Sequence, residues 1–331
     1  MNQAIKWIPR GCSGGWTKPL TSPVLGPEYG TSFDMQVLKE DGKYRMWFSW
    51  RPVNLIGYAE STDGITWTLP RVVFTPDPSS DWEAHEVNRP SIIKKDGMYH
   101  MWYTGQMFPG NETRGSSAIG YATSPDGITW TRYNKPVLSP EEKWEGISVM
   151  CPEVHWDEKR NIFRMWYSGG EMEEPDAIGY AESSDGIQWI RHSSNPIFVP
   201  DSSKFCEMKK VTAGHLLIQE DWHYMFYIGF DGDGRPSCCL ARSKDGISGW
   251  ERHPDNPVIA GSDGYWDHDG VYRVSVVKED DGYSLWYNGA NYPYELIGYA
   301  RHEGFDLGFD SMPERNDGGC LLYTSPSPRD A

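Results

Sequence analysis

The feature that most constrains the fold is a phrase that recurs five times along the chain. The equivalent Trp or Phe stands at positions 47, 102, 166, 226 and 286, so successive copies lie 55 to 64 residues apart. A repeat of this length indicates an array of similar supersecondary units rather than one irregular core. In four copies a glycine ends the phrase, which occupies residues 44–50, 99–105, 163–169, 223–229 and 283–289 (YRMWFSW, YHMWYTG, FRMWYSG, HYMFYIG and YSLWYNG).

Each copy predicts four strands. A short apolar segment comes first, such as MQVL or PSII, and a turn leads from it to the aromatic phrase, whose residues alternate faces. A third segment follows, IGYA in four copies, and an Asp-Gly turn then leads to a fourth strand that opens on Trp. The chain is therefore predicted to be all-β, a five-bladed β-propeller with four antiparallel strands per blade. The structural alternative is a solenoid, but solenoid repeats are shorter and more uniform than these.

The repeat also sets the expected domain limits. Residues 1–310 are predicted to form a single propeller domain, in which residues near Ile5–Pro9 lie beside the fifth copy, because that copy lacks a good last strand. Residues 316–331 break the repeat and resemble the translated adapter read-through found at the ends of metagenomic assemblies. We expect this tail to be non-native.

The composition limits the kinds of molecule that this protein is expected to bind. The formal net charge of −16 repels phosphate backbones and anionic membranes, so we expect neither nucleic acid nor a membrane as partner. The first residues hold no apolar run of signal-peptide length, which predicts a cytoplasmic protein. The oligomeric state is not readable from the sequence.

The Asp-Gly turns recur at Asp63, Asp126, Asp185 and Asp245. A functional reading is possible, but Asp and Gly are the residues that shape such turns. We expect a structural role, with the following Trp packed between neighbouring units.

Candidate functional residues stand at the start of the first strand of each copy. In a propeller these strands line the central channel and begin at the same rim. Charges there are costly unless they are paired or used, and two facing carboxyl groups are what glycoside hydrolysis requires. The other interpretation is that the charges pair across the channel and close it. The candidates are Asp34, Glu86, Asn88, Arg89, Glu153, Glu207, Lys209, Lys210, His215, Asp267, His268, Asp269 and Arg273.

From residue 7 to about 310, the repeat resembles the five-bladed propeller glycoside hydrolases of families 43, 62, 32, 68, 117 and 130. The resemblance implies acidic residues in the first three blades. Asp34 would be base or nucleophile, Glu153 the general acid, and Glu86 or Asp269 the group that tunes their pKa values. The chain lacks the Asp of the fructosidase Arg-Asp-Pro signature, having Asn88–Arg89–Pro90 instead, which argues against an ordinary fructosidase.

The expected substrate is a carbohydrate. No catalytic metal or cofactor is expected, but the resemblance implies a possible structural calcium ion in the channel, with His215 or His268 as ligand. A lone His is more often a hydrogen-bonded structural residue. The residues expected to bind sugar are Asn88, Arg89, Lys210, Arg273, Tyr272, Trp266, Trp82 and His268.

The predicted function is hydrolysis of a neutral oligosaccharide or glycoside of the arabinosidase, xylosidase or fructosidase kind. A non-catalytic propeller that binds a glycan or a protein is one alternative, and a phosphate-dependent glycoside phosphorylase is another. The turns also resemble the Asp-boxes of sialidases, although those proteins have six blades and an arginine triad. An open pocket shared by Asp34 and Glu153 would favour the hydrolase.

Overall fold

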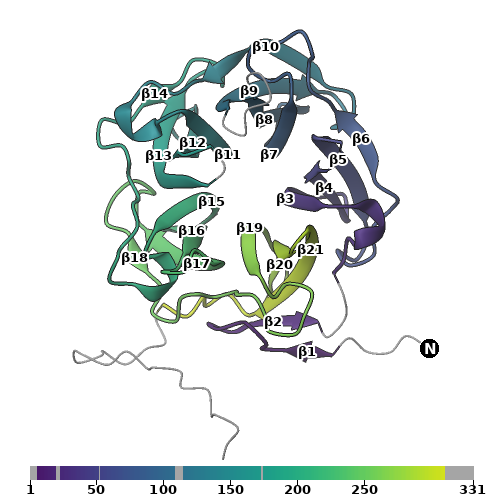
Figure 1. The fold of residues 1–331 in the computed structure, drawn as a ribbon, viewed down its shortest axis with the longest axis vertical. Coiled ribbons are helices and arrows are strands. Elements are labelled where there is room, and N and C mark those ends of the chain that lie inside the picture. Colours follow the sequence, from purple (N-terminus) through teal and green to yellow (C-terminus); the bar gives the residue numbers. More distant parts are fainter. Residues whose placement is uncertain (1–5, 20–22, 52, 109–114, 173, 310–331) are drawn as a thin grey trace, which may run out of the picture.

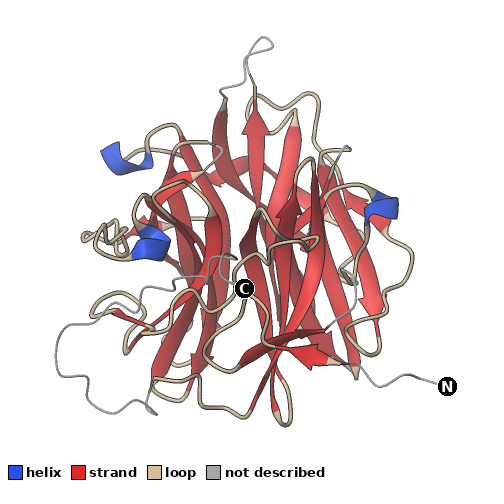
Figure 2. Cartoon of the chain, turned by 60° about the horizontal axis from the view of Figure 1, so that its bottom comes forward, coloured by secondary structure: helices blue, strands red, loops and turns tan. Residues whose placement is uncertain are grey.

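The computed structural model describes residues 6–19, 23–51, 53–108, 115–172 and 174–309. Strands dominate this part of the chain, and its helices are the short 3-10 turns η1 (Pro27–Tyr29), η3 (Lys143–Glu145) and η4 (Phe205–Glu207) (Figure 2). None of these helices has the length and apolar character needed to cross a bilayer. Residues 316–331 and Ile5, about which the sequence made predictions, lie outside the described residues.

The strands are arranged radially about a central axis (Figure 1). Hydrogen bonds join them into four sheets, of which the largest consists of two antiparallel four-stranded groups linked where Ser148 pairs in parallel with Ser117. In chain order, the first group is β3 (Ser32–Glu40), β4 (Lys43–Trp50), β5 (Leu55–Ser61) and β6 (Arg71–Phe74), and the second is β7 (Glu86–Lys95), β8 (Met98–Met107), β9 (Ser116–Ser124) and β10 (Thr131–Leu138). The third group is β11 (Ser148–Asp157), β12 (Ile162–Gly170), β13 (Pro175–Ser183) and β14 (Ile190–Arg191), and the fourth is β15 (Lys210–Gln219), β16 (Trp222–Phe230), β17 (Pro236–Ser243) and β18 (Glu251–Arg252). The fifth group is β19 (Gly270–Lys278), β20 (Gly282–Asn291) and β21 (Tyr294–Glu303).

The N-terminal segment completes the last of these groups. Strand β2 (Trp16–Pro19) pairs with β21, opposing Trp16 to His302, and β1 (Trp7–Ile8) pairs with β2. The N-terminal segment thus joins the last group as predicted, but the strand that pairs with β21 is Trp16–Pro19, and Trp7 and Ile8 lie one strand further out.

The innermost strands β3, β7, β11, β15 and β19 surround the axis, and each contacts the next, with β19 contacting β3. The Asp-Gly turns join neighbouring groups at the periphery. The indole of Trp47 donates to the carbonyl oxygen of Gly127 at 2.8 Å, and Trp286 donates to that of Gly64 at the same distance, across the two ends of the chain.

The turns themselves are rigid for local reasons. Asp126 Oδ1 accepts hydrogen bonds from the amides of Ile128 and Thr129, and these bonds lower the pKa of Asp126 to about 2. The carbonyl group of the following glycine then points at an indole of the neighbouring group. The structural interpretation of the Asp-Gly turns is confirmed.

The glycine that ends the aromatic phrase makes room for a tryptophan. A Cβ on Gly105 would lie 2.4 Å from a ring carbon of Trp82, and one on Gly289 would lie 2.5 Å from Trp266. Trp82 stacks on Tyr103 and Trp266 on Tyr287, inside the blades. Both rings pack against the sheet, and sugar binding by Trp82 and Trp266 stays a prediction.

A buried acid anchors four of the five groups in the same way. The hydroxyls of Tyr103, Tyr167 and Tyr227 donate to Glu83, Glu145 and Glu207 at 2.6–2.7 Å, and that of Tyr287 donates to Asp267 at 3.0 Å. Each acid also meets a cation from an outer segment, namely Arg132, Arg191, Arg252 and Lys18. Glu207 and Asp267 are therefore structural.

Replacing Gly169 with Ala tests this packing. The new Cβ would lie 2.6 Å from Trp144 and 3.1 Å from the backbone of Glu145, so we expect a loss of about 1–3 kcal/mol in the free energy of unfolding, measured with urea. Gly232→Ala is the control, because its Cβ would meet only Met208, at 3.4 Å or beyond. Equal stability of the two variants would contradict the packing argument.

Candidate active site

All five innermost strands carry a β-bulge at the same level. In β3 the register shifts between Phe33 and Gln36, and equivalent shifts occur in β7, β11, β15 and β19. The first bulged residue has a positive φ of 46–53° in four of these strands, at Asp34, Arg89, Cys151 and Ala213. Bulges re-aim side chains, and non-glycine residues with this backbone cluster at functional sites.

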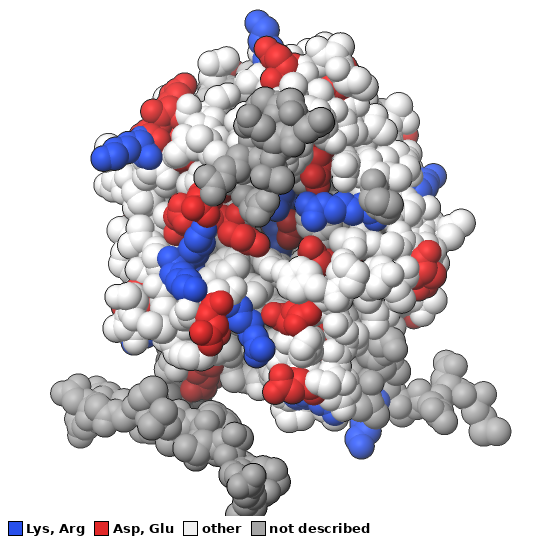
Figure 3. Space-filling model, viewed as in Figure 1, with Lys and Arg blue, Asp and Glu red and all other residues white. Residues whose placement is uncertain are grey.

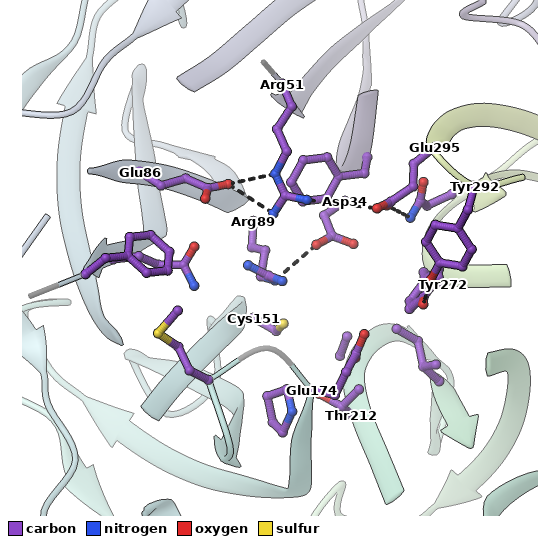
Figure 4. Close-up of a pocket in the computed structure, with 18 residues that line it drawn as sticks. Asp34, Arg51, Glu86, Arg89, Cys151, Glu174, Thr212, Tyr272, Tyr292 and Glu295 are labelled. Atoms are coloured by element: carbon purple, nitrogen blue, oxygen red, sulfur yellow. Dashed lines mark hydrogen bonds and ion pairs between the residues drawn. The ribbon is translucent and has the colours of Figure 1, made fainter. Parts of the chain in front are cut away.

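These four residues line one cavity of about 250 Å³. Its opening lies in the face shown in Figure 3, where acidic and basic side chains gather near the axis. The charged residues that line it are Asp34, Arg51, Glu86, Arg89, Glu174 and Glu295, of which several are ion-paired (Figure 4). Phe33, Phe108, Tyr272 and Tyr292 give it aromatic walls.

Two arginines organise the carboxylates. Arg89 Nε lies 3.1 Å from Asp34 Oδ2. Arg51 donates to Glu86 Oε1 at 3.3 Å and lies 4.0 Å from Glu295 Oε1. The charges of both arginines are thus met by carboxylates of the cavity itself.

Asn88 acts behind this cavity. It is fully buried; its Oδ1 accepts a hydrogen bond from Arg89 Nη1 at 3.0 Å, and its amide nitrogen donates to Gln106 at 2.7 Å. The side chain therefore holds Arg89 in place and does not line the cavity, so the expectation that Asn88 binds sugar directly is wrong.

Glu174 differs from the other carboxyl groups of the cavity. It stands just before β13 and is partly exposed to the cavity. Burial raises the pKa of Glu174 to about 8; the Arg89 charge opposes this shift, and the Asp34 and Glu295 charges add to it. Within the described ranges no hydrogen bond or ion pair holds its carboxyl group, and at neutral pH Glu174 carries a proton.

Glu153 lies elsewhere. It is buried, and it lines a cavity at the opposite end of the innermost strands, together with His155 and His215. Its carboxylate lies 3.1 Å from each histidine and 3.3 Å from Arg273 Nη2. Burial acts to raise the pKa of Glu153, but the histidines outweigh it and hold that pKa well below its ordinary value. The expectation that Asp34 and Glu153 share one pocket is wrong, and an ionised Glu153 has no proton to give.

Glu153 belongs instead to a series of clasps between neighbouring innermost strands. Backbone amides of the next strand donate to the side chains of Ser91, Glu153, His215 and Ser275, at 2.9–3.3 Å. These four residues occupy equivalent positions. Each lies opposite the Trp or Phe of the aromatic phrase, in the second strand of its own group. Glu153 therefore has a structural role. Because it is a buried carboxylate, it also needs the donors His155, His215 and Arg273 that surround it.

His215 does not fit as a calcium ligand. Its Nε2 accepts the Val276 amide at 3.0 Å, and its Nδ1 lies 3.1 Å from Glu153. Both ring nitrogens are therefore engaged. Within the described residues, no group of three or more His, Cys, Asp and Glu is placed to hold a metal ion.

The remaining candidates contact the cavity from outside or not at all. Lys210 does not line it and instead donates to Glu171 and to the Glu174 carbonyl at 2.8 Å. Arg273 is buried and donates to the Pro152 carbonyl at 2.9 Å. His268 and Asp269 pair with each other at 3.0 Å, outside the cavity lining. This placement does not support the predicted substrate contacts of Lys210, Arg273 and His268, nor the catalytic role predicted for Asp269.

Sequence reasoning placed Asp34, Glu86, Arg89 and Tyr272 in the cavity, and it missed Arg51, Glu174, Tyr292 and Glu295. The missed residues lie around the hairpin between the second and third strand of a group. Because strands alternate in direction, this hairpin returns to the rim where the first strand begins. Glu174, just before the third strand of its group, and Glu295, at the start of the third strand of another, carried that signal.

The sequence profile of glycosyl hydrolases family 43 matches residues 21–306, and the chain belongs to this family. Among curated proteins, an uncharacterised protein of Mycobacterium tuberculosis is 30% identical over 165 residues, which is 45% of this chain and 51% of that protein. A 1,2-beta-oligomannan phosphorylase of Thermoanaerobacter is 24% identical over 229 residues, 66% of this chain and 69% of that enzyme. The chain thus matches only about half the length of the first of these relatives.

Solved structures share the fold. A thermostable family-43 glycoside hydrolase superimposes with a TM-score of 0.65 at 16% identity, covering 93% of this chain and 99% of that one. An exo-1,5-alpha-L-arabinanase from a bovine ruminal metagenomic library gives 0.61 at 20% identity, covering 83% and 94%. The all-β propeller class and the predicted relationship to the propeller glycoside hydrolases are confirmed.

Removing the charge of Glu153 should weaken the fold. In Glu153→Gln, Arg273 keeps a buried charge without its partner, and we expect a loss of about 3–5 kcal/mol in the free energy of unfolding at pH 7. The pKa of Glu153 is lowered in the folded protein, so the charged group stabilises above its unfolded pKa near 4.5 and this gain fades as the pH falls below it. The difference between wild type and variant, measured with urea at several pH values, should shrink in acid. A constant difference would contradict the ionised state.

Proposed function

We propose that this protein is a glycoside hydrolase whose active site is the cavity of Asp34 and Glu174. One observation carries the proposal: a single cavity is lined by Asp34, which is ion-paired with Arg89, and by Glu174, whose pKa burial raises to about 8. Glycoside hydrolysis needs one carboxylic acid to protonate the leaving oxygen and one carboxylate as base or nucleophile. Membership of glycosyl hydrolases family 43 supports this assignment.

In this proposal Glu174 is the general acid and Asp34 the base or nucleophile. Arg89 holds Asp34, and Asn88 holds Arg89. The charges of Arg89 and Lys210 lower the pKa of Glu174, and those of Asp34 and Glu295 raise it. Glu86 and Asp269, the modulators expected from the sequence, are not among these groups. Glu86 orients Arg51 instead.

We also propose that the fold is a closed propeller of five blades. The contact of β19 with β3 and the bond from Trp286 to Gly64 join the two ends of the array. Each antiparallel group would be one blade, and β2 would supply the last strand of the fifth. A closed ring fixes the innermost strands around one axis, as a shared cavity requires.

Hydrolysis fits the cavity better than phosphorolysis does. Its lining holds four carboxyl groups and two arginines, and each arginine lies against a carboxylate. A phosphate ion would have to enter a negative site and displace these pairs. The same charge balance favours a neutral sugar over a uronic acid.

Inorganic phosphate is therefore expected neither to speed the reaction nor to give a sugar phosphate. The substrates to test are aryl glycosides, 1,5-linked arabino-oligosaccharides and 1,2-linked manno-oligosaccharides, with and without phosphate, with products separated by chromatography. Formation of a sugar 1-phosphate in place of the free sugar would overturn the hydrolytic assignment.

Glu174→Gln is expected to lower kcat by about 10²–10⁴-fold on oligosaccharides, because the leaving oxygen loses its proton donor. Wild-type activity should decline as the pH rises through about 8, where Glu174 loses its proton. The variant should lack this alkaline decline. Glycosides whose aglycone leaves without protonation should be affected much less.

The matched control is Glu171→Gln, because Glu171 lies three residues earlier, is exposed and does not line the cavity. Its activity should stay close to that of the wild type. Asp34→Asn should abolish turnover on every substrate, because even a substrate with a good leaving group still needs the base or nucleophile. Full activity of either Glu174→Gln or Asp34→Asn would refute the assignment.

A further inference from the structure

An exposed tyrosine stands at the mouth of the cavity. The Tyr292 residue is 60% exposed, yet it contributes to the cavity lining. Single exposed apolar residues are common and need no explanation. Tyr292 is different because polar contacts hold it from two directions.

The first contact joins it to Tyr272, whose hydroxyl lies 2.6 Å from that of Tyr292. The second is the Tyr292 amide, which donates to Asp269 Oδ2 at 2.8 Å. Asp269 is itself paired with His268 Nδ1 at 3.0 Å. Figure 4 shows Tyr272 and Tyr292 close together on one wall of the cavity.

This wall lies within electrostatic reach of Glu174. Burial raises the pKa of Tyr272, and the nearby Glu174 charge raises it further. The pKa of Tyr292 is raised by burial as well, with contributions from the charges of Glu295 and Glu174. The two tyrosines and Glu174 line the same cavity.

The place of the proton donor decides which part of a substrate meets this wall. A general acid protonates the oxygen that joins the reacting sugar to its leaving group, so the leaving group lies on the side of the acid. Aromatic rings offer a flat apolar face, and a tyrosine hydroxyl adds a polar handle. A sugar ring can pack its C–H groups on the aromatic face and hydrogen-bond the tyrosine hydroxyl through its own hydroxyls.

We propose that Tyr272 and Tyr292 form a binding platform for the leaving-group sugar, and that Asp269 is a positioning residue that holds Tyr292. This inference rests on the proposed function. The substrate class that follows is an oligosaccharide with at least one sugar beyond the bond that is cleaved. A simple alkyl glycoside has no ring to place there.

The test compares two substrates with the same reacting sugar, the best oligosaccharide of the set above and the corresponding methyl glycoside. The quantity measured is the kcat/KM for the oligosaccharide divided by the kcat/KM for the methyl glycoside. Tyr292→Ala should lower this ratio about ten-fold, and Asp269→Asn should lower it in the same direction by a smaller factor. Tyr292→Phe keeps the ring and should retain most of the ratio.

Tyr294→Ala is the matched control. Tyr294 lies two residues further along, is 51% exposed and does not line the cavity, so its ratio should equal that of the wild type. An unchanged ratio in Tyr292→Ala, or an equal fall in Tyr294→Ala, would overturn the platform.

A binding measurement separates this inference from the proposed function. Glu174→Gln, and the same variant with Tyr292→Ala, are titrated calorimetrically with arabinobiose, mannobiose and the matching monosaccharides. Tighter binding of a disaccharide than of its monosaccharide, lost with Tyr292→Ala, supports the platform even if the wild type cleaves nothing. Equal binding of both sugars by both variants refutes the platform, even if the wild type proves to be a hydrolase.

Discussion

The structure depends on hydrogen bonds that cross from one innermost strand to the next. Side chains of Ser91, Glu153, His215 and Ser275 accept backbone amides of the following strand, deep between the sheets. At the periphery, indoles such as Trp47 and Trp286 bind the carbonyl groups of the neighbouring Asp-Gly turns. The sheets are thus fixed at two radii, and their relative orientation cannot drift. A cavity built from separate sheets needs that rigidity, because its side chains come from segments far apart in the sequence.

The bulges divide each innermost strand into a part that serves the site and a part that serves the scaffold. Asp34, Arg89, Cys151 and Ala213 take a left-handed backbone there and line the cavity. In three of these strands the residue two positions further along accepts the bond from the next strand, namely Ser91, Glu153 and His215. A strand rises about 3.3 Å per residue, so two residues separate the two functions by about 6–7 Å.

That short distance explains what the sequence could and could not predict. The repeated Trp, the Asp-Gly turns and the glycine that ends the aromatic phrase predict strands, turns and packing, because each has a local physical cause. Asp34 and Arg89 could be placed from the same repeat. Glu153 was assigned to the site because it stands on the first strand of its copy, where the family resemblance implies an acid. Its depth along that strand, which the repeat does not give, puts Glu153 among the clasps. Glu174 was missed because the repeat was searched only at the first strands, although the hairpin before β13 returns to the same rim.

Glu153 and Glu174 show how neighbours decide what a carboxyl group can do. Both are glutamates, and burial acts to raise the pKa of each. Around Glu153 stand His155, His215 and Arg273, which favour the charged form and make it a structural anchor. Around Glu174 the charges of Asp34 and Glu295 counter that of Arg89, so the proton stays. Glu153 therefore lacks the proton that the sequence reading required of it, and Glu174 keeps one. The difference follows from which donors and which anions lie beside each carboxyl group.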